Sequence, residues 1–258
     1  MRRKLIVANW KSNPESWREA KAILAPLKRT IKNLTKVEAI ICPPAIFLPD
    51  SFTLISKTQR LSLGAQDAFW EPTGPYTGQV SAAMLRKAGA KYVILGHSER
   101  RALGENNGQT NLKIKAALKE GLRVIFCVGE KERDQHGFYL KTLKQQLEDG
   151  LKGIPRKWLA DLVVAYEPVW SVGAKARRVD TPADFVEQAI FIKKVASGFI
   201  GNEAARKLPV LYGGSVSPKN ASGFLSVGEA DGLLVGRASL CADKFSDILR
   251  QANEAKSL

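Results

Sequence analysis

Eight short apolar runs, rich in β-branched residues, recur along the whole chain of 258 residues. They read LIVANW, VEAIICPP, LSLGAQ, YVILGH, VIFCVGE, LVVAYEPVW, PVLYGGS and GLLVGRAS. The apolar residues are continuous rather than alternating, which is typical of strands buried on both faces. Segments with helical periodicity lie between the runs, among them 16–34, 79–90, 110–121, 138–153 and 181–198. This alternation predicts parallel strands joined by right-handed crossover helices.

The number of repeating units distinguishes two parallel architectures. Eight strand–helix units predict an α/β fold of the (β/α)8 barrel type, with residues 1–258 forming a single domain. An open, doubly wound sheet is the alternative, and it would usually carry a glycine-rich turn after its first strand. That position reads ANWKSN, which has no such glycines.

The net charge of +15 is the unusual global property, because the composition is otherwise ordinary, with 45% hydrophobic and 25% charged residues. The basic residues are scattered, which favours a solvated basic surface over a nucleic-acid interface. Such a surface would also attract small anions. Nucleic-acid binding remains an alternative, as an added role of this surface.

The chain carries no evident targeting or membrane signal. Its basic start resembles a secretory leader, but Asn9 and Lys11 interrupt the apolar run. No apolar stretch reaches the roughly 18 to 20 residues of a membrane helix. The three cysteines, Cys42, Cys127 and Cys241, form no close pair and are expected to be reduced. We therefore expect a cytoplasmic protein with no membrane partner.

Polar residues gather at the points where the predicted strands end. In a parallel barrel these ends meet at one mouth, where the chemistry of such folds takes place. Side chains from distant parts of the chain should therefore converge there: Asn9, Lys11, Gln66, His97, Glu99, Glu130, Glu167, Gly213–Ser215 and Gly236.

Two of these residues have chemistry that can be interpreted individually. Glu167 follows a strand directly, and an apolar barrel mouth should raise its pKa and suit it to proton abstraction. His97 precedes a predicted helix start, whose positive end favours a neutral ring that donates a hydrogen bond. A salt-bridged strand-end carboxylate and a satisfied core histidine are the structural alternatives. Lys11 and Glu99 could form an ion pair at the strand ends, which is more often structural than catalytic.

Glycine-rich turns follow the last two predicted strands, at 212–215 and around Gly236. Backbone N–H groups exposed in such turns can bind phosphate. Tight turns that need glycine for positive φ are the alternative explanation.

Six motifs occur in an order that resembles the triosephosphate isomerase family. They are NWK (9–11), GHSERR (96–101), CVGE (127–130), AYEPVW (165–170), YGGSV (212–216) and DGLLVGRASL (231–240). The resemblance covers nearly the whole chain. It implies an aldose–ketose isomerase of glycolysis and gluconeogenesis, which interconverts dihydroxyacetone phosphate and D-glyceraldehyde 3-phosphate through an enediol(ate). It implies no metal and no cofactor.

The resemblance also implies roles for individual residues, of which the first two are established for this family. Glu167 would be the base, and neutral His97 would polarise the carbonyl. Lys11, with Asn9 beside it, would stabilise the developing oxyanion and bind phosphate. Glu99 would hold Lys11 or assist proton transfer.

The remaining substrate-binding residues implied are Gly173, Ser215, Gly236 and Arg237, in addition to Asn9 and Lys11. The stretch from Ser171 to Asp180 resembles the family's lid, but it is about two residues longer than usual and contains two arginines. Tyr212 and Ser215 would still hold the closed lid. Arg237 stands where a glycine is common, and we expect its side chain to point outward rather than toward phosphate.

The stretch 64–82 resembles the family's protruding third loop, with Thr77 at its tip. Its aromatic residues Phe69, Trp70 and Tyr76 support an interface, so a homodimer is expected. A loop folded over its own barrel is the alternative. Ser12 and Gln79 replace a usual methionine and glutamate, which would weaken the interface.

Another phosphate-binding barrel, such as an aldolase or an enzyme resembling indole-glycerol-phosphate synthase, is the competing enzymatic reading. It would need a Schiff-base lysine within a strand or a second pair of carboxylates. We find neither at a matching place.

Overall fold

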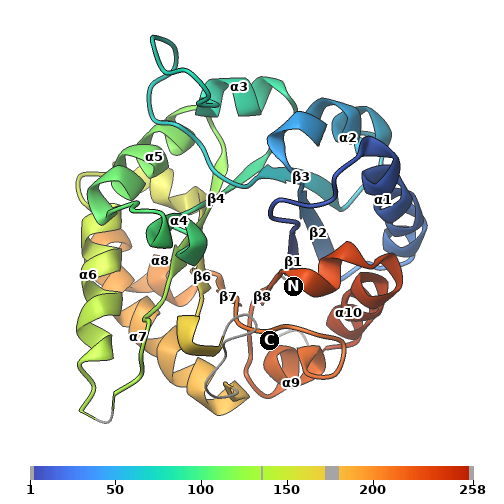
Figure 1. Ribbon diagram of the computed structural model, residues 1–258. Helices are drawn as coiled ribbons and strands as arrows, with labels where there is room; N and C mark the ends of the chain where they lie inside the picture. Colours follow the sequence, from blue (N-terminus) through green and yellow to red (C-terminus); the bar gives the residue numbers. More distant parts are fainter. Residues whose placement is uncertain (1–2, 135, 172–179, 256–258) are drawn as a thin grey trace.

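The computed structural model describes residues 3–134, 136–171 and 180–255. Eight parallel strands pair in sequence order, and β1 also pairs with β8, so the sheet closes into a barrel (Figure 1). The (β/α)8 prediction is confirmed, and the open sheet is excluded. The strands are β1 Lys4–Asn9, β2 Val37–Cys42, β3 Leu61–Ala65, β4 Tyr92–Leu95, β5 Arg123–Val128, β6 Leu162–Tyr166, β7 Val210–Tyr212 and β8 Gly232–Val235.

Helices form a ring around the barrel (Figure 1). Those predicted from periodicity correspond to α1, α3, α5, α6 and α7, whereas α2, α4, α8, α9 and α10 were not among the named segments. The bounds are α1 Trp17–Lys32, α2 Leu48–Ile55, α3 Ala82–Lys87, α4 Ser98–Ala102, α5 Asn107–Lys119, α6 Tyr139–Leu151, α7 Pro182–Ile200, α8 Asn202–Arg206, α9 Ala221–Ser226 and α10 Ala242–Glu254.

Side-chain caps mark where the two longest helices begin. The hydroxyl of Ser16 accepts a hydrogen bond from the Glu19 N–H at the start of α1. At the start of α7, Thr181 and Asp184 form a reciprocal capping box. These caps satisfy backbone donors that the first helical turn leaves without a partner. The second cap places α7 directly after the connection that leaves β6.

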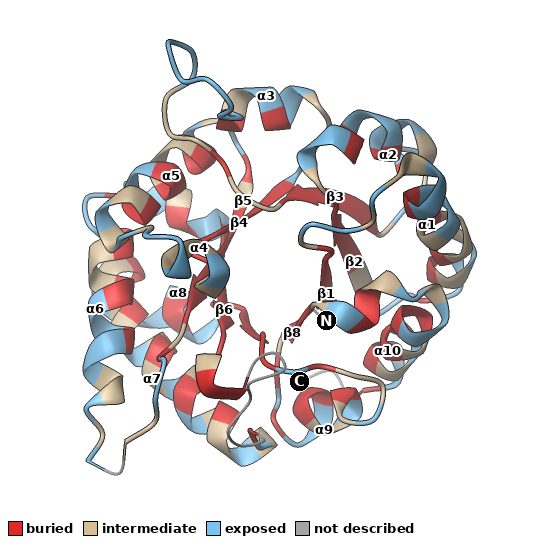
Figure 2. Ribbon diagram, viewed as in Figure 1, coloured by how far each residue is buried: buried red, intermediate tan, exposed pale blue. Residues whose placement is uncertain are grey.

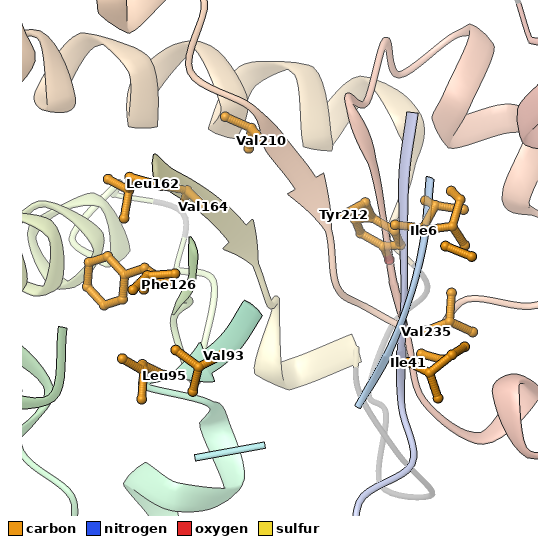
Figure 3. Close-up of a cluster of buried hydrophobic side chains, with 14 of the residues drawn as sticks. Ile6, Ile41, Val93, Leu95, Phe126, Leu162, Val164, Val210, Tyr212 and Val235 are labelled. Carbon is orange, nitrogen blue, oxygen red and sulfur yellow. The ribbon is translucent and has the colours of Figure 1, made fainter. Parts of the chain in front are cut away.

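Two layers of apolar side chains alternate along the strands. One layer fills the interior of the barrel, and the other, part of which Figure 3 shows, packs between the strands and the helices. The strands are buried along most of their length (Figure 2). In β6, Val163 and Ala165 point inward, so the same period of two brings Glu167 to the mouth. In β1, Leu5 and Val7 lead in the same way to Asn9. Inward- and outward-facing side chains therefore alternate along each strand even though most of them are apolar, and this alternation determines which strand-end residues face the site.

The reduced thiols and the protruding loop at 64–82 are both found as expected from the sequence. Cys42 and Cys127 lie inside the barrel, where burial raises the pKa of both, while Cys241 is exposed. The loop before α3 projects beyond the ring of helices (Figure 1). Within the described residues, every helix is too short or too polar to cross a membrane.

Candidate active site

Glu167 lies immediately beyond β6, and only 3% of it is exposed. One carboxylate oxygen lies 3.0 Å from His97 Nε2, and the other accepts a hydrogen bond of 3.0 Å from the Ser98 N–H. These partners follow β4, far from Glu167 in the sequence. The predicted convergence of Glu167 and His97 at one mouth is confirmed.

The charge state of Glu167 differs from the expectation. Burial raises its pKa, as the apolar surroundings suggested, but the His97 ring and the Ser98 N–H outweigh burial and leave the pKa lowered. The predicted raised pKa was therefore wrong, because the sequence did not reveal how many donors converge on this carboxylate. Glu167 is ionised at neutral pH and is ready to accept a proton.

The hydrogen bonds of His97 identify its tautomer. Its Nδ1 accepts the Glu99 N–H at 3.2 Å, so the proton is on Nε2, which faces Glu167. The donating Nε2 agrees with the prediction from the start of α4, whereas the neutrality of the ring stays a prediction. Burial lowers the pKa of His97, but the neighbouring Glu167 carboxylate raises it and sets the net upward direction. A group that displaces this carboxylate would remove what favours protonation.

Lys11 is held by contacts on both sides of its backbone. It has a left-handed φ of 54°, its N–H donates to Asn9 Oδ1 at 3.1 Å, and its carbonyl accepts from Gln66 Nε2 at 2.8 Å. The ammonium lies 2.6 Å from Glu99 Oε1, which confirms the predicted ion pair. Lys11 Cε lies 3.6 Å from the place that a Cβ would take on Gly236. The side chain thus spans the mouth beside the end of β8.

Two glycines let neighbouring backbones approach Glu167 closely. A Cβ on Gly129 would lie 1.8 Å from the Glu167 carbonyl oxygen, and one on Gly213 would lie 3.0 Å from Glu167 Cγ. The Gly213 N–H also donates to the Tyr166 carbonyl at 2.8 Å. The chain after β5 therefore packs against the backbone of Glu167, and the chain after β7 packs against its side chain.

The predicted phosphate-binding turns follow the adjacent strands β7 and β8. Ser215 is exposed, and its carbonyl accepts a hydrogen bond from Asn220 Nδ2 at 2.8 Å. Gly236 is partly buried, whereas Arg237 is exposed, in keeping with the expected outward orientation. Gly173 lies outside the described residues, so its phosphate contact stays a prediction.

Glu130 is a second buried carboxylate, at the end of β5. Its Oε1 accepts hydrogen bonds from the Tyr166 hydroxyl and from Trp170 Nε1, both at 2.8 Å. Burial raises its pKa. Together with Trp170 it lines a cavity of about 720 Å³ that also reaches Glu167. The sequence marked Glu130 only as a strand-end polar residue; the structure shows that it anchors the start of the β6–α7 connection.

Ser98 contributes a contact that sequence reasoning missed, whereas Gln66 was expected at the mouth. The Ser98 N–H reaches Glu167 because Gly96 has a φ of 70° and turns the chain after β4. A glycine directly before a strand-end histidine was the available signal. Among the described residues, no three His, Cys, Asp or Glu side chains gather so as to hold a metal ion.

Comparison with known proteins decides the family. The triosephosphate isomerase family model matches residues 4–252. The chain belongs to the triosephosphate isomerase family. The triosephosphate isomerase of Citrifermentans bemidjiense is 42% identical over 97% of this chain and 99% of that protein. The enzyme of Dictyoglomus thermophilum is 40% identical over 97% of this chain and 100% of its own length.

A solved structure gives the same result in three dimensions. The crystal structure of the triosephosphate isomerase from Bartonella henselae superimposes with a TM-score of 0.84 at 37% identity, covering 96% of this chain and 98% of that one. Membership of the triosephosphate isomerase family therefore rests on sequence and fold together. Neither comparison supports another phosphate-binding barrel or a nucleic-acid-binding protein.

Proposed function

We propose that Glu167 is the base with which this isomerase interconverts dihydroxyacetone phosphate and D-glyceraldehyde 3-phosphate. The observation that carries the assignment is the buried contact of its carboxylate with the Nε2–H of His97. A substrate oxygen at that N–H would take the donor from Glu167. The carboxylate then loses a stabilising partner next to the carbon acid, which increases its basicity.

The reaction balances within the substrate. Glu167 takes a proton from the carbon beside the carbonyl, and the electron pair left behind forms the carbon–carbon double bond of the enediolate. His97 Nε2–H and the Lys11 ammonium stabilise the negative charge on oxygen. Glu167 then returns the proton to the neighbouring carbon. The hydroxyl proton of the first carbon passes, by way of His97, to the former carbonyl oxygen, so that the first carbon becomes the new carbonyl. The carbonyl itself receives the electron pair, so the proposed step uses no metal and no cofactor.

Lys11 has a further part in substrate binding. Its ammonium, paired with Glu99 at 2.6 Å, reaches the mouth beside Gly236, where backbone N–H groups would bind phosphate. Asn9 holds the Lys11 backbone through its Oδ1. Ser215, Gly173 and the Arg237 backbone complete the proposed phosphate site, in the same way as the resemblance implies.

A coupled isomerase assay with Glu167→Gln tests the assignment. The amide keeps the volume but cannot accept the proton, so turnover should fall by a factor of about 10² to 10⁴. Glu148→Gln, an exposed carboxylate on α6, is the matched control and should keep wild-type turnover. Activity that survives Glu167→Gln would mean that the base is another residue.

The protruding loop around Thr77 supports the proposal of a homodimer. Exposed apolar side chains gather on this loop and on the elements beside it, including Tyr76, Val80, Met84 and Leu103, the last with 78% of its surface exposed. The rings of Phe69 and Tyr76 also contact each other within the loop, with centroids 4.7 Å apart. A second copy would remove this apolar surface from water.

Sedimentation velocity at decreasing concentration tests the dimer. We expect a dimer whose dissociation is measurable in the micromolar range or above, because Ser12 and Gln79 offer less packing and charge pairing. A fully active monomer at all concentrations would contradict the proposal.

We further propose that residues 1–258 form one catalytic domain, which the barrel closure between β1 and β8 supports. We also propose a cytoplasmic location, which the buried thiols support.

A further inference from the structure

Asp180 is a buried carboxylate just before α7, at the far end of the β6–α7 connection. The residue is 4% exposed, and its side chain is wholly buried. Neither carboxylate oxygen accepts a hydrogen bond of ordinary geometry from a described group; the Thr181 N–H and the Tyr212 hydroxyl interact with the carboxylate only weakly. Buried carboxylates are normally paired or hydrogen-bonded, because an unpaired charge away from water is costly. The position of Asp180 therefore needs an explanation.

Arg133, on the connection between β5 and α6, is the described cation that faces Asp180, but other carboxylates hold it. Its Nη1 lies 3.9 Å from Asp180 Oδ1 and only 3.3 Å from Asp184 Oδ1. Its Nη2 lies 3.2 Å from Glu187 Oε2. Its guanidinium also stacks over the ring of Tyr139 at 5.1 Å. Arg133 therefore pairs mainly with the α7 carboxylates Asp184 and Glu187, and it neutralises the charge of Asp180 only weakly.

The other described groups around Asp180 add negative charge or none. Glu130 comes from the end of β5, and Tyr166 and Tyr212 come from β6 and β7. Burial and then the Asp184 carboxylate raise the pKa of Asp180 to about 7, against the opposing effect of Arg133. Two more cations of the same connection, at 177 and 178, lie outside the described residues.

Tyr212 links Asp180 to the turn that follows β7. Its hydroxyl interacts with the side chains of Asp180 and Ser171, and its ring stacks on Phe224 with centroids 3.6 Å apart. The hydroxyl packs directly beneath Gly214, where an added Cβ would lie 2.2 Å from it. A charge on Asp180 therefore acts electrostatically on the Gly213–Ser215 turn from the side on which Tyr212 packs.

We propose that Asp180 is a positioning residue that makes the binding of a phosphate dianion at the Gly213–Ser215 turn weaken as the pH rises through neutrality. The proposal rests on the proposed function for the place of the phosphate. Protonated Asp180 is neutral and fits its buried surroundings beside Tyr212. Ionised Asp180 repels the dianion and is drawn toward Arg133, away from the hydroxyl that supports the turn.

Inorganic sulfate is a suitable probe, because it stays a dianion from pH 6 to pH 9 while a phosphate ester gains charge near pH 6. Its binding is measured by calorimetry for the wild type and for Asp180→Asn. We expect the dissociation constant of the wild type to rise by roughly threefold to tenfold over this range. In Asp180→Asn, which has the same shape and no titrating group, it should change by less than about twofold.

Glu148→Gln is the control, since this carboxylate pairs with Lys144 on α6 and not with Arg133, so the variant should keep the wild-type pH dependence. A second readout is steady-state kinetics, where Asp180→Asn should remove the rise of KM with pH and leave kcat nearly unchanged. The same pH dependence in Asp180→Asn as in the wild type would overturn the proposal. A wild type that shows the expected pH dependence of sulfate binding but no isomerase activity would instead contradict the proposed function alone.

Discussion

Glu167 and Asp180 stand at the two ends of the connection between β6 and α7, and both carboxylates are buried. Burial raises the pKa of each, yet the net directions are opposite, downward for Glu167 and upward to about 7 for Asp180. The difference lies in the donors that reach them. Glu167 has the His97 ring and the Ser98 N–H, both at 3.0 Å, whereas Arg133 approaches Asp180 no closer than 3.9 Å.

Glu105 extends this contrast to a structural cluster. Its side chain is 4% exposed, and Lys113 Nζ lies 2.5 Å from one oxygen. Lys113 also lies 2.7 Å from Asp67, which pairs in turn with Arg100 at 3.0 Å. Burial raises the pKa of Glu105, but Lys113 outweighs it and the net direction is downward. Two cations serve two carboxylates here, so close donors rather than depth of burial determine the charge state.

Replacing the donor of Glu167 should have the largest effect. His97→Gln removes the ring that lowers the Glu167 pKa and polarises the substrate, so turnover should fall by a factor of about 10² to 10⁴. The pKa of Glu167 should also rise, which shifts the acid limb of the activity profile to higher pH. The measurement is the pH dependence of kcat, with His136→Gln, the exposed second histidine, as the control. An unchanged acid limb would refute the donor account.

Removing Lys113 from its cluster with Glu105 and Asp67 should lower the stability of the fold. Lys113→Met leaves the buried Glu105 carboxylate without its closest cation, with only Arg100 at 3.6 Å, and we expect the free energy of unfolding to fall by about 3 to 5 kcal/mol. Chemical denaturation measures it. Lys119→Met, on the exposed side of the same helix, should change the value by less than about 0.5 kcal/mol. Equal effects of the two variants would show that the cluster is not stabilised by its pairing.

Neutral substitutions of Asp180 and Glu105 should change stability in opposite directions at neutral and alkaline pH, and both should have little effect in acid. Folded Asp180 binds its proton more tightly than the unfolded chain, from 3.8 to about 7, so wild-type stability falls as the pH rises through this window. Asp180→Asn should therefore raise the free energy of unfolding by about 1 to 2 kcal/mol at pH 8 and have little effect at pH 4.

The pKa of Glu105 is lowered in the folded state, so its contribution is present above the unfolded pKa and disappears as the pH falls through the folded one. Glu105→Gln should therefore destabilise at pH 7 by more than it does in acid. Thermal melts across pH measure both variants. Destabilisation by Asp180→Asn at pH 8 would show that its carboxylate is better paired than its contacts indicate.

An exposed pair sets the lower limit of these effects. Lys144 and Glu148 lie four residues apart on α6 at 3.8 Å, with 57% and 43% of their side chains exposed. Water screens this pair, so Lys144→Ala should change the free energy of unfolding by less than about 0.5 kcal/mol at any pH. Urea denaturation tests this expectation; a loss above 1 kcal/mol would mean that proximity alone, without burial, is sufficient.

The barrel and the meeting of its strand ends could be predicted from the sequence, because both follow from repetition. Eight apolar runs specify eight strands, and parallel pairing brings their ends together. The Lys11–Glu99 pair and the donating His97 were within reach for the same reason, since each belongs to a strand end. The phase within each run was not used, although it is what directs Glu167 inward after Val163 and Ala165.

The direction of the Glu167 pKa and the exceptional state of Asp180 were beyond sequence reasoning. The first depends on a backbone N–H that the positive φ of Gly96 aims at the carboxylate. The second depends on Arg133 being nearer to Asp184 than to Asp180, a difference of 0.6 Å between 3.9 and 3.3 Å. Neither the turn angle nor such a small preference leaves a pattern in the order of residues.

The close approach of Gly129, just after β5, to the Glu167 backbone, just after β6, restricts how this mouth can be redesigned. A methyl group there would overlap the carbonyl oxygen of residue 167, at 1.8 Å. Libraries that randomise the loops for a new substrate should thus recover glycine at 129 in every functional clone, whatever reaction is selected. Substitutions that change specificity would have to be made at side chains lining the rim, while the contact between Gly129 and the residue 167 carbonyl stays the same.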